Sequence, residues 1–312
     1  MKKYTKFLNE NLPYEGEDWI LDEEEDIEEL TEKAEGKLSD MSPEKHKLYR
    51  QNEVEGVQWH KDHPISHENI VHHYNQATHD EVFHGDNWYK DAQHLSKAVA
   101  KDTGIKHHTM AGLIANYSPR ASWAPNIMTA SIVARHKRGM GGIGSGVFAN
   151  GLQKEAAQKI LNGDHYDKVL KGNKIRAFGH LIEHGGDKDP KNPRVAVDRH
   201  AYSVAAGARI TDAAFDKAPI NSAKGYKHVS DAYVRAAKVL SEQHGRVIHP
   251  HQVQSTTWLV RQRMNAQEEH ASKKSSRTAK VAQTKKKEWE AYAGEHHPDI
   301  VGKAPGTGYD KD

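Results

Sequence analysis

The sequence predicts an all-α protein, and three observations carry this prediction. Apolar residues recur at intervals of three and four along the middle of the chain, which places them on one face of a helix. Ser66 and Asp198, two residue types that cap helices, stand at the start of two such stretches. No stretch alternates apolar and polar residues long enough to indicate a sheet. Residues 46–270 are therefore expected to form a helical domain.

The first helices of this domain follow Pro64. Ser66 is expected to cap a helix that runs through Tyr74. The apolar face of the next helix is made of Trp88, Ala92, Leu95, Ala98 and Val99. A strongly apolar helix over 109–117 is expected to end at Ser118, because the proline that follows disfavours helical dihedrals in the residue before it.

The rest of the domain reads as further helices separated by turns. The expected elements are a helix at 124–137, a glycine-rich loop at 139–146, a helix at 153–161, a short segment at 166–170, a glycine turn at 171–173, a helix at 174–184, a polar loop at 185–194, an apolar triplet at 195–197, and helices at 198–207, 222–244 and 254–264.

Composition excludes several classes of protein. The chain has 312 residues, enough for one large domain or two small ones, and a mean hydropathy of −0.89, which predicts disordered segments. The absence of cysteine excludes disulfides, thiol catalysis and Cys-ligated metal centres. No apolar run reaches the length of a bilayer span, and the N-terminus has no signal-peptide core. We therefore expect a cytoplasmic protein.

The net charge of +2 hides a strong asymmetry. Residues 1–37 carry 13 acids and 5 bases, a charge of −8, so the remaining 275 residues carry +10. A basic body favours a polyanionic partner such as DNA. The acidic segment, 1–45, is expected to be a disordered arm, although it could also mimic DNA or bind a phage or host protein. Residues 271–312 read as a lysine-rich flexible tail, able to add salt-sensitive affinity for DNA.

Two motifs carry the strongest chemical signal. The first is a glycine turn that opens a helix, Gly172-Asn173-Lys174, whose amides and lysine are suited to hold a phosphate. The second is an apolar triplet followed by Asp198-Arg199-His200 at the start of the next helix. If the helix between them runs back alongside, Asp198 and Lys174 face the same cleft. An acid near an amine produces the shifted pKa values that acid–base or nucleophilic chemistry requires.

These motifs, within residues 109–207, resemble the helix–hairpin–helix DNA glycosylase superfamily. The family's hairpin ends in Gly-x-Lys before an alanine-containing helix, as in Gly172-Asn173-Lys174 and Ala177. The family then has an apolar segment with Val-Asp-x-His, which is similar to Val197-Asp198-Arg199-His200. The resemblance implies a helical glycosylase-like fold, duplex DNA as partner, and extrusion of the target base from the helix.

The chain also departs from that family. Its hairpin is abbreviated, the loop at 185–194 is longer, and the cluster-binding cysteines of some members are absent. The segment Tyr117-Ser-Pro-Arg-Ala-Ser-Trp123 replaces a glutamine-rich motif and resembles a divergent bacteriophage branch. That branch includes thymine pyrophosphorylases of DNA hypermodification, which act on a substituted pyrimidine without breaking the glycosidic bond. The resemblance therefore implies a phage-encoded protein.

By this resemblance Lys174 is the candidate amine nucleophile, and Asp198 stabilises positive charge on the sugar or orients the attacking group. The residues expected to contact the base or the DNA backbone are Tyr117, Ser118, Arg120, Ser122, Trp123, Asn126, Gly172, Asn173, Arg199 and His200. Simpler interpretations remain open. Lys174 could only contact phosphate, Asp198 could only cap its helix, and the two aromatic residues could only pack in the core.

Other motifs are weaker. The spacing Gly139-x-Gly141-x-x-Gly144 matches a dinucleotide fingerprint but follows a helix instead of a strand, so we interpret it as a flexible loop. The 23 histidines form no metalloprotease-type motif, and we expect neither a metal nor a cofactor. The segment from His249 to Arg263 is expected to pack Trp258 in the core or to contact DNA.

The sequence thus favours a DNA-binding enzyme that acts on a nucleobase, either by excising the base or by transferring a group to it. The alternative is a non-catalytic protein that uses the same fold to bind DNA, a virion component or a partner protein. A third hypothesis, in which the acidic arm makes the protein an inhibitor of a host protein, leaves the two motifs unexplained.

Overall fold

The computed structural model describes residues 54–119, 121, 123–136, 151–187, 189 and 193–271. Within these ranges the chain forms helices and no strand, which confirms the all-α prediction. In the described part of the chain, every helix is too short or too polar to traverse a lipid bilayer. The acidic arm at 1–45, the loop at 139–146 and residues 272–312 lie outside the described ranges.

A helix over residues 54–62 precedes the labelled elements. These are α4 (His67–Tyr74), α5 (His79–Thr103), α6 (His107–Tyr117), α7 (Trp123–His136), α8 (Gly151–Leu161), α9 (Tyr166–Val169), α10 (Asn173–His184), α11 (Arg199–Ala205), α12 (Asp212–Asp216), the 3₁₀ turn η1 (Pro219–Asn221), α13 (Ala223–His244) and α14 (Pro250–Ala271).

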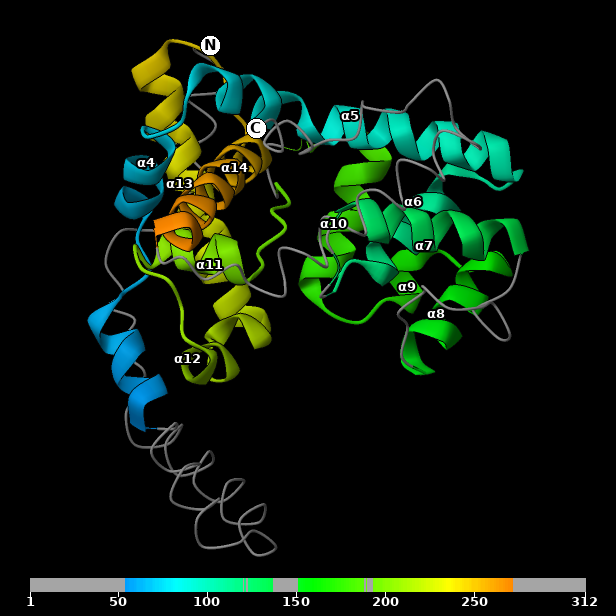
Figure 1. Cartoon of the computed structure of the whole chain (residues 1–312), viewed down its shortest axis with the longest axis horizontal. Helices are drawn as coiled ribbons and strands as arrows, with labels where there is room; N and C mark the ends of the chain where they lie inside the picture. The colour runs from blue at the N-terminus through cyan, green and yellow to red at the C-terminus, as the bar shows by residue number, and fades with distance from the viewer. Residues whose placement is uncertain are drawn as a thin grey trace, which may run out of the picture.

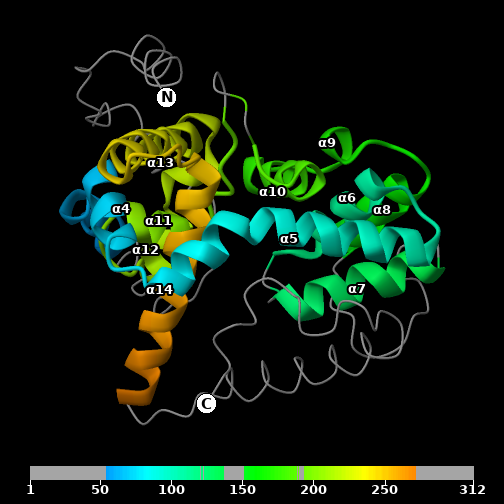
Figure 2. The ribbon, with the colours of Figure 1, turned by 90° about the horizontal axis from the view of Figure 1, so that it is seen from above.

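The helices gather around two hydrophobic clusters, which we call the first and second lobes. The first lobe contains α6, α7, α8, α9 and α10, and its core includes Leu113, Ile114 and Leu181. The second lobe contains α4, α11, α12, α13 and α14, and its core includes Tyr202 and Tyr233. Figure 1 shows the two lobes side by side, with the 25-residue helix α5 running along both. Figure 2, seen from above, shows the same arrangement.

Helix α5 joins the lobes through close packing on α14. A Cβ at Gly85 would lie 2.0 Å from the Thr256 hydroxyl oxygen, so only glycine permits this approach. The Ser255 hydroxyl donates to the Gly85 carbonyl at 2.7 Å. One turn further on, the Tyr89 hydroxyl donates to Gln254 Oε1 at 2.9 Å. These contacts fix the angle at which α5 leaves the second lobe.

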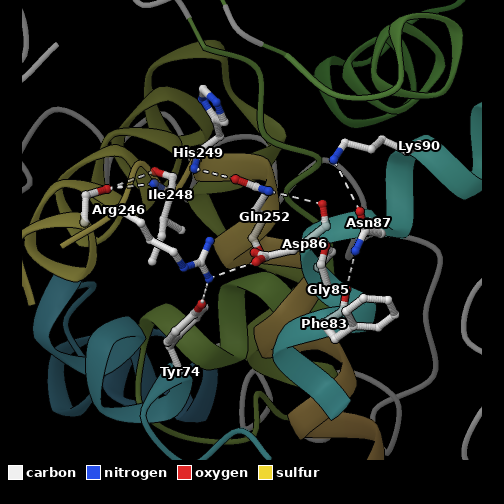
Figure 3. Close-up of polar contacts among 12 residues, drawn as sticks. Tyr74, Phe83, Gly85, Asp86, Asn87, Lys90, Arg246, Ile248, His249 and Gln252 are labelled. Atoms are coloured by element: carbon white, nitrogen blue, oxygen red, sulfur yellow. Dashed lines mark hydrogen bonds and ion pairs between the residues drawn. The ribbon is translucent and has the colours of Figure 1, made fainter. Parts of the chain in front are cut away.

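A polar cluster reinforces the same junction (Figure 3). Asp86 of α5 pairs with Arg246, which follows α13, at 2.8 Å. Arg246 also donates to the Tyr74 hydroxyl at 3.3 Å, and Gln252 donates to the Asp86 carbonyl at 3.1 Å. Burial raises the pKa of Tyr74 to about 12, so its hydroxyl remains neutral beside the ion pair. Side chains from α4, α5 and α14 thus meet at one point.

The apolar triplet at 195–197 passes between the two lobes. Val195 and Val197 pack in the core of the second lobe, whereas Ala196 packs in the core of the first. The Val197 amide donates to the Val195 carbonyl at 3.0 Å, so the backbone turns at Ala196, and the three residues serve both cores. The triplet therefore delivers the next residue, Asp198, to the boundary between the lobes.

Several helix ends confirm the sequence prediction. Ser66 caps α4 by accepting from the Asn69 amide, and Ser222 caps α13 in the same way. Helix α6 ends at Tyr117 as predicted, but Ser118 keeps helical dihedrals (φ −67°, ψ −26°) despite the proline that follows. The helix over 54–62 and α12 were not predicted, and α14 begins four residues earlier than expected, at Pro250.

Candidate active site

Lys174 is the second residue of α10, on the first lobe. Its amine donates a hydrogen bond to the Ser118 hydroxyl at 3.1 Å and lies 5.0 Å from the centre of the Phe178 ring. Phe178 is one turn further along the same helix, so the lysine stem and the ring share one face. Helix α10 reaches this position because it packs closely on α6, where a Cβ at Gly179 would stand 3.2 Å from the Ala115 side chain.

The glycine turn predicted before α10 is confirmed. Gly172 is the N-cap of the helix and has a φ of 106°, a value that favours glycine. Short helix α9, the turn and α10 together form the compact hairpin that aims Lys174 at the end of α6. The N-cap glycine offers no side chain to the helix, so the α10 terminus is capped without a side-chain hydrogen bond.

The surroundings of Lys174 favour its neutral form. Burial lowers the pKa of the Lys174 amine, and the carboxylate of Asp198 acts in the opposite direction. The interaction with Asp198 means that the two predicted catalytic residues are near enough for the charge of one to act on the other. Among the described residues, Lys174 has no direct salt bridge to an acid, so no close anion restores its usual basicity.

Asp198 is the N-cap of α11, as the sequence predicts. Its Oδ1 accepts a hydrogen bond from the Ala201 amide at 2.9 Å, and the side chain is partly exposed. A carboxylate at a helix N-terminus is stabilised by the helix dipole. The residue therefore serves as a cap with one oxygen, and the sequence left open whether capping is its only role.

Tyr226 of α13 fixes the backbone that leads to Asp198. The Tyr226 hydroxyl donates to the Val195 carbonyl at 2.6 Å and accepts from the Val197 amide at 3.1 Å. Burial raises the pKa of the Tyr226 hydroxyl, and the Asp198 charge adds to that rise. The hydroxyl thus stays protonated and can make both bonds, which holds the residues before Asp198 in one conformation.

Aromatic side chains from four helices meet around Trp88, and one of them is Phe178, the ring beside Lys174. Trp88 of α5 contacts Trp123 of α7, Phe178 of α10 and Trp258 of α14, with ring centroids 5.0, 5.9 and 6.1 Å apart. We call these four residues the aromatic cluster. The indole nitrogens of Trp88 and Trp123 are buried and have no hydrogen-bond partner among the described residues. Buried donors without partners are unusual in proteins.

The other predicted contact residues separate into several groups. Asn126 is buried on α7, one turn after Trp123, and its Oδ1 has no partner in the described ranges. Tyr117 is buried in α6, and its hydroxyl likewise has no partner there. Asn173 accepts a hydrogen bond from Arg176, which lies on the same helix.

Arg199 lies in the second lobe, where its guanidinium pairs with Asp212 at 2.6 Å and donates to the Ile210 carbonyl at 2.9 Å. These contacts give it a structural role around α12. His200 is partly buried in α11 and forms no hydrogen bond or ring contact with the described residues. Arg120 and Ser122 lie outside the described residues.

Three features of this site escaped the sequence prediction. The Ser118 bond to Lys174 joins residues 56 positions apart, and no local pattern indicates such a contact. Trp88 was expected only as a core residue of its helix, and the segment of Trp258 was expected to pack in the core or to contact DNA. Tyr226 lies on α13, far along the chain from the triplet it holds. Within the described ranges, no group of three or more His, Asp or Glu side chains could hold a metal ion.

Residues 58–266 match the model of a family of unknown function, DUF7178, which covers more than half of the chain. The chain belongs to this family. The DUF7178 region includes both lobes, and with them Lys174, Asp198 and the aromatic cluster, but it leaves out the acidic arm and the lysine-rich tail. No match was found among curated proteins or among solved structures.

Proposed function

We propose that this DUF7178 protein is an enzyme that acts on a nucleobase in DNA, with Lys174 and Asp198 at its centre. The observation that carries the proposal is the electrostatic link between a desolvated amine and an acid that come from different lobes. An amine whose pKa is lowered and an acid within range of its charge are the pair that nucleophilic chemistry on a sugar or base requires. If Asp198 served only as a helix cap, it would not need a lysine near it.

In the first form of the proposal the protein excises the base. The Lys174 lone pair forms a bond to C1′ of the deoxyribose, and the glycosidic bond breaks with its electron pair leaving on the base, which then takes up a proton. The amine loses a proton as the sugar ring opens to the Schiff base. Asp198, whose charge already acts on the amine, stabilises the positive charge that develops at C1′.

In the second form the protein transfers a group to a modified pyrimidine. An amine of the incoming group attacks the carbon of the 5-substituent, and the bond from that carbon to its leaving group breaks. Lys174 or Asp198 takes the proton that the amine releases. The glycosidic bond stays intact, so the two forms yield different products from the same DNA.

The aromatic cluster supports either form. A base removed from the duplex needs flat apolar surfaces on which to stack, and hydrogen-bonding groups that recognise its edge. The rings of Trp123 and Phe178 are only partly buried and offer such surfaces, and the buried N–H groups of Trp88 and Trp123 have no partner among the described residues. On the same helix face as Trp123, Asn126 adds an acceptor that has no partner in the described part of the chain.

Mass spectrometry of nucleosides and free bases tests the proposal. Ordinary DNA, damaged DNA and DNA with 5-substituted pyrimidines are incubated with the full-length protein and with the Asp198→Asn variant. A free base released only by the unmodified protein supports excision, and a nucleoside of changed mass supports transfer. Absence of both products across the panel, with DNA still bound, contradicts the proposal and favours a binding protein.

The salt dependence of DNA binding separates the enzyme from that rival. The lysine-rich tail is expected to bind any DNA through counterion release. If the helical body binds DNA through a site of its own, a variant ending at residue 271 keeps affinity and a measurable salt slope. If removal of the tail abolishes nearly all affinity for DNA, the result would favour the non-catalytic function.

A further inference from the structure

We propose that Ser118 is a positioning residue that turns the lone pair of the Lys174 amine away from the protein and toward the substrate. The inference rests on the proposed function, because it assigns the orientation of the same nucleophile. It is carried by the direction of two successive hydrogen bonds, from Lys174 to Ser118 and from Ser118 to Ala115. Among the described residues, the Lys174 amine has no other hydrogen-bond acceptor.

The Ser118 hydroxyl has one proton, and that proton is committed. Ser118 Oγ lies 2.9 Å from the Ala115 carbonyl oxygen, which can only accept a hydrogen bond. Toward Lys174, at 3.1 Å, the same oxygen can therefore only accept. The amine N–H therefore donates to the hydroxyl, and the hydroxyl donates to the carbonyl. In a neutral amine this arrangement occupies an N–H and leaves the lone pair free.

The opposite direction would disable the amine. If the hydroxyl donated to Lys174, it would occupy the lone pair that must attack. The end of α6 prevents this, since Ser118 retains helical dihedrals and its hydroxyl lies within reach of the carbonyl three residues earlier. The Ala115 carbonyl also accepts from the Ser118 backbone amide at 3.2 Å, so both hydrogen-bond donors of Ser118 are directed at the same oxygen.

The remaining contacts of Lys174 restrict the amine further. The Phe178 ring lies 5.0 Å from the amine on one side. Asp198 acts on the amine through its charge, without a direct salt bridge. One polar anchor and one aromatic neighbour thus set the direction of the amine, and small rotations away from it would misalign the attack.

Labelling of the lysine by formaldehyde and cyanoborohydride tests this inference without any DNA. The rate of methylation at Lys174 is followed by peptide mass spectrometry from pH 6 to 10 in the full-length protein, Ser118→Ala and Ser118→Thr. Exposed Lys171, three residues earlier, is the internal control because it lies outside the site. Circular dichroism melts confirm that each variant is folded.

Without Ser118 the amine can rotate so that its lone pair faces the protein, where formaldehyde does not reach it. We therefore expect Ser118→Ala to lower the high-pH plateau of the Lys174 rate by about tenfold relative to Lys171. Ser118→Thr, which keeps the hydroxyl, is expected to restore the rate to within about twofold. Loss of the acceptor also disfavours the charged amine, so the midpoint of the profile should fall in Ser118→Ala. A role limited to this electrostatic effect would move the midpoint and leave the plateau unchanged.

An unchanged or higher plateau in Ser118→Ala overturns the inference, as does a loss that Ser118→Thr fails to restore. The labelling needs no substrate, so its outcome is separate from that of the DNA assay. If Ser118→Ala lowers the Lys174 labelling rate as expected but no DNA yields a product, the proposed function is rejected and the inference about Ser118 stands.

Discussion

Substitution of Asp198 separates its structural role from its electrostatic role. As the N-cap of α11, Asp198 accepts one hydrogen bond from the Ala201 amide at 2.9 Å. Loss of such a cap costs about 1 kcal/mol of stability, whereas asparagine is as good a cap as aspartate. In a domain of this size 1 kcal/mol corresponds to a fall of about 2 to 4 °C in Tm. We therefore expect Asp198→Ala to lower Tm by that amount and Asp198→Asn to leave it nearly unchanged.

The chemistry should respond differently, because both variants remove the charge. Without the Asp198 carboxylate, the pKa of Lys174 loses the influence that raises it and falls further below its usual range. Stabilisation of positive charge at the sugar is lost at the same time, and removal of one such group commonly costs about 100-fold or more in rate. Asp198→Asn should thus be stable and inactive.

Two assays decide between these roles. Thermal melts by circular dichroism give Tm, and product formation on the responsive DNA from the mass-spectrometry panel gives the rate. The reasoning is refuted if Asp198→Asn keeps full activity, since the residue would then act only as a cap. An equal loss of stability in both variants would also contradict it, because the asparagine side chain should preserve the hydrogen bond.

Two further predictions concern the stability of the helical body. Glu81 is fully buried, and its carboxylate is held by Arg263 at 2.8 Å and by the Thr78 amide at 2.8 Å. Arg263→Met removes the cationic partner of this buried carboxylate, so urea unfolding should show a loss of about 3 to 5 kcal/mol. The double variant Arg263→Met with Glu81→Gln should recover part of that loss. A loss below about 1 kcal/mol would show that the pair is dispensable. Burial lowers the pKa of His73 to about 4, whereas a value of about 6.5 is expected in the unfolded chain. Between these two pH values the unfolded state binds a proton at His73 that the folded state does not bind. Stability should therefore decrease between pH 7 and 5, by about 1 to 2 kcal/mol from this residue, and His73→Gln should remove that part; identical pH dependence in the two proteins would contradict the assignment.

Local signals in the sequence were enough to predict most helices, and the glycine turn and the helix cap at which Lys174 and Asp198 lie. Ser66, Ser222 and Asp198 predicted helix starts because a capping side chain acts within its own turn. Gly172 predicted the turn before Lys174 because only glycine adopts its φ readily. Such interactions span three or four residues and leave a readable pattern.

Features that depend on distant contacts could not be predicted in this way. The helix over 54–62 is short and polar, and it is held to the second lobe by contacts such as that of His60 Nε2 with the Ala214 carbonyl at 2.8 Å. The aromatic cluster assembles residues from four helices, of which only Trp123 had been assigned to the site. The Ser118 bond to Lys174 depends on how α10 packs on α6, which no local pattern encodes.

The central claim is that Lys174 performs chemistry on DNA, and a matched pair of lysine variants tests it most directly. Lys174→Met and Lys171→Met each replace a lysine amine by a methionine side chain, three residues apart, but Lys171 is exposed and lies outside the site. Single-turnover product formation is measured by mass spectrometry for both variants and the unmodified protein. The account predicts a loss of at least about 100-fold at Lys174 and a rate within about twofold of normal at Lys171. Equal rates for the two variants would contradict it.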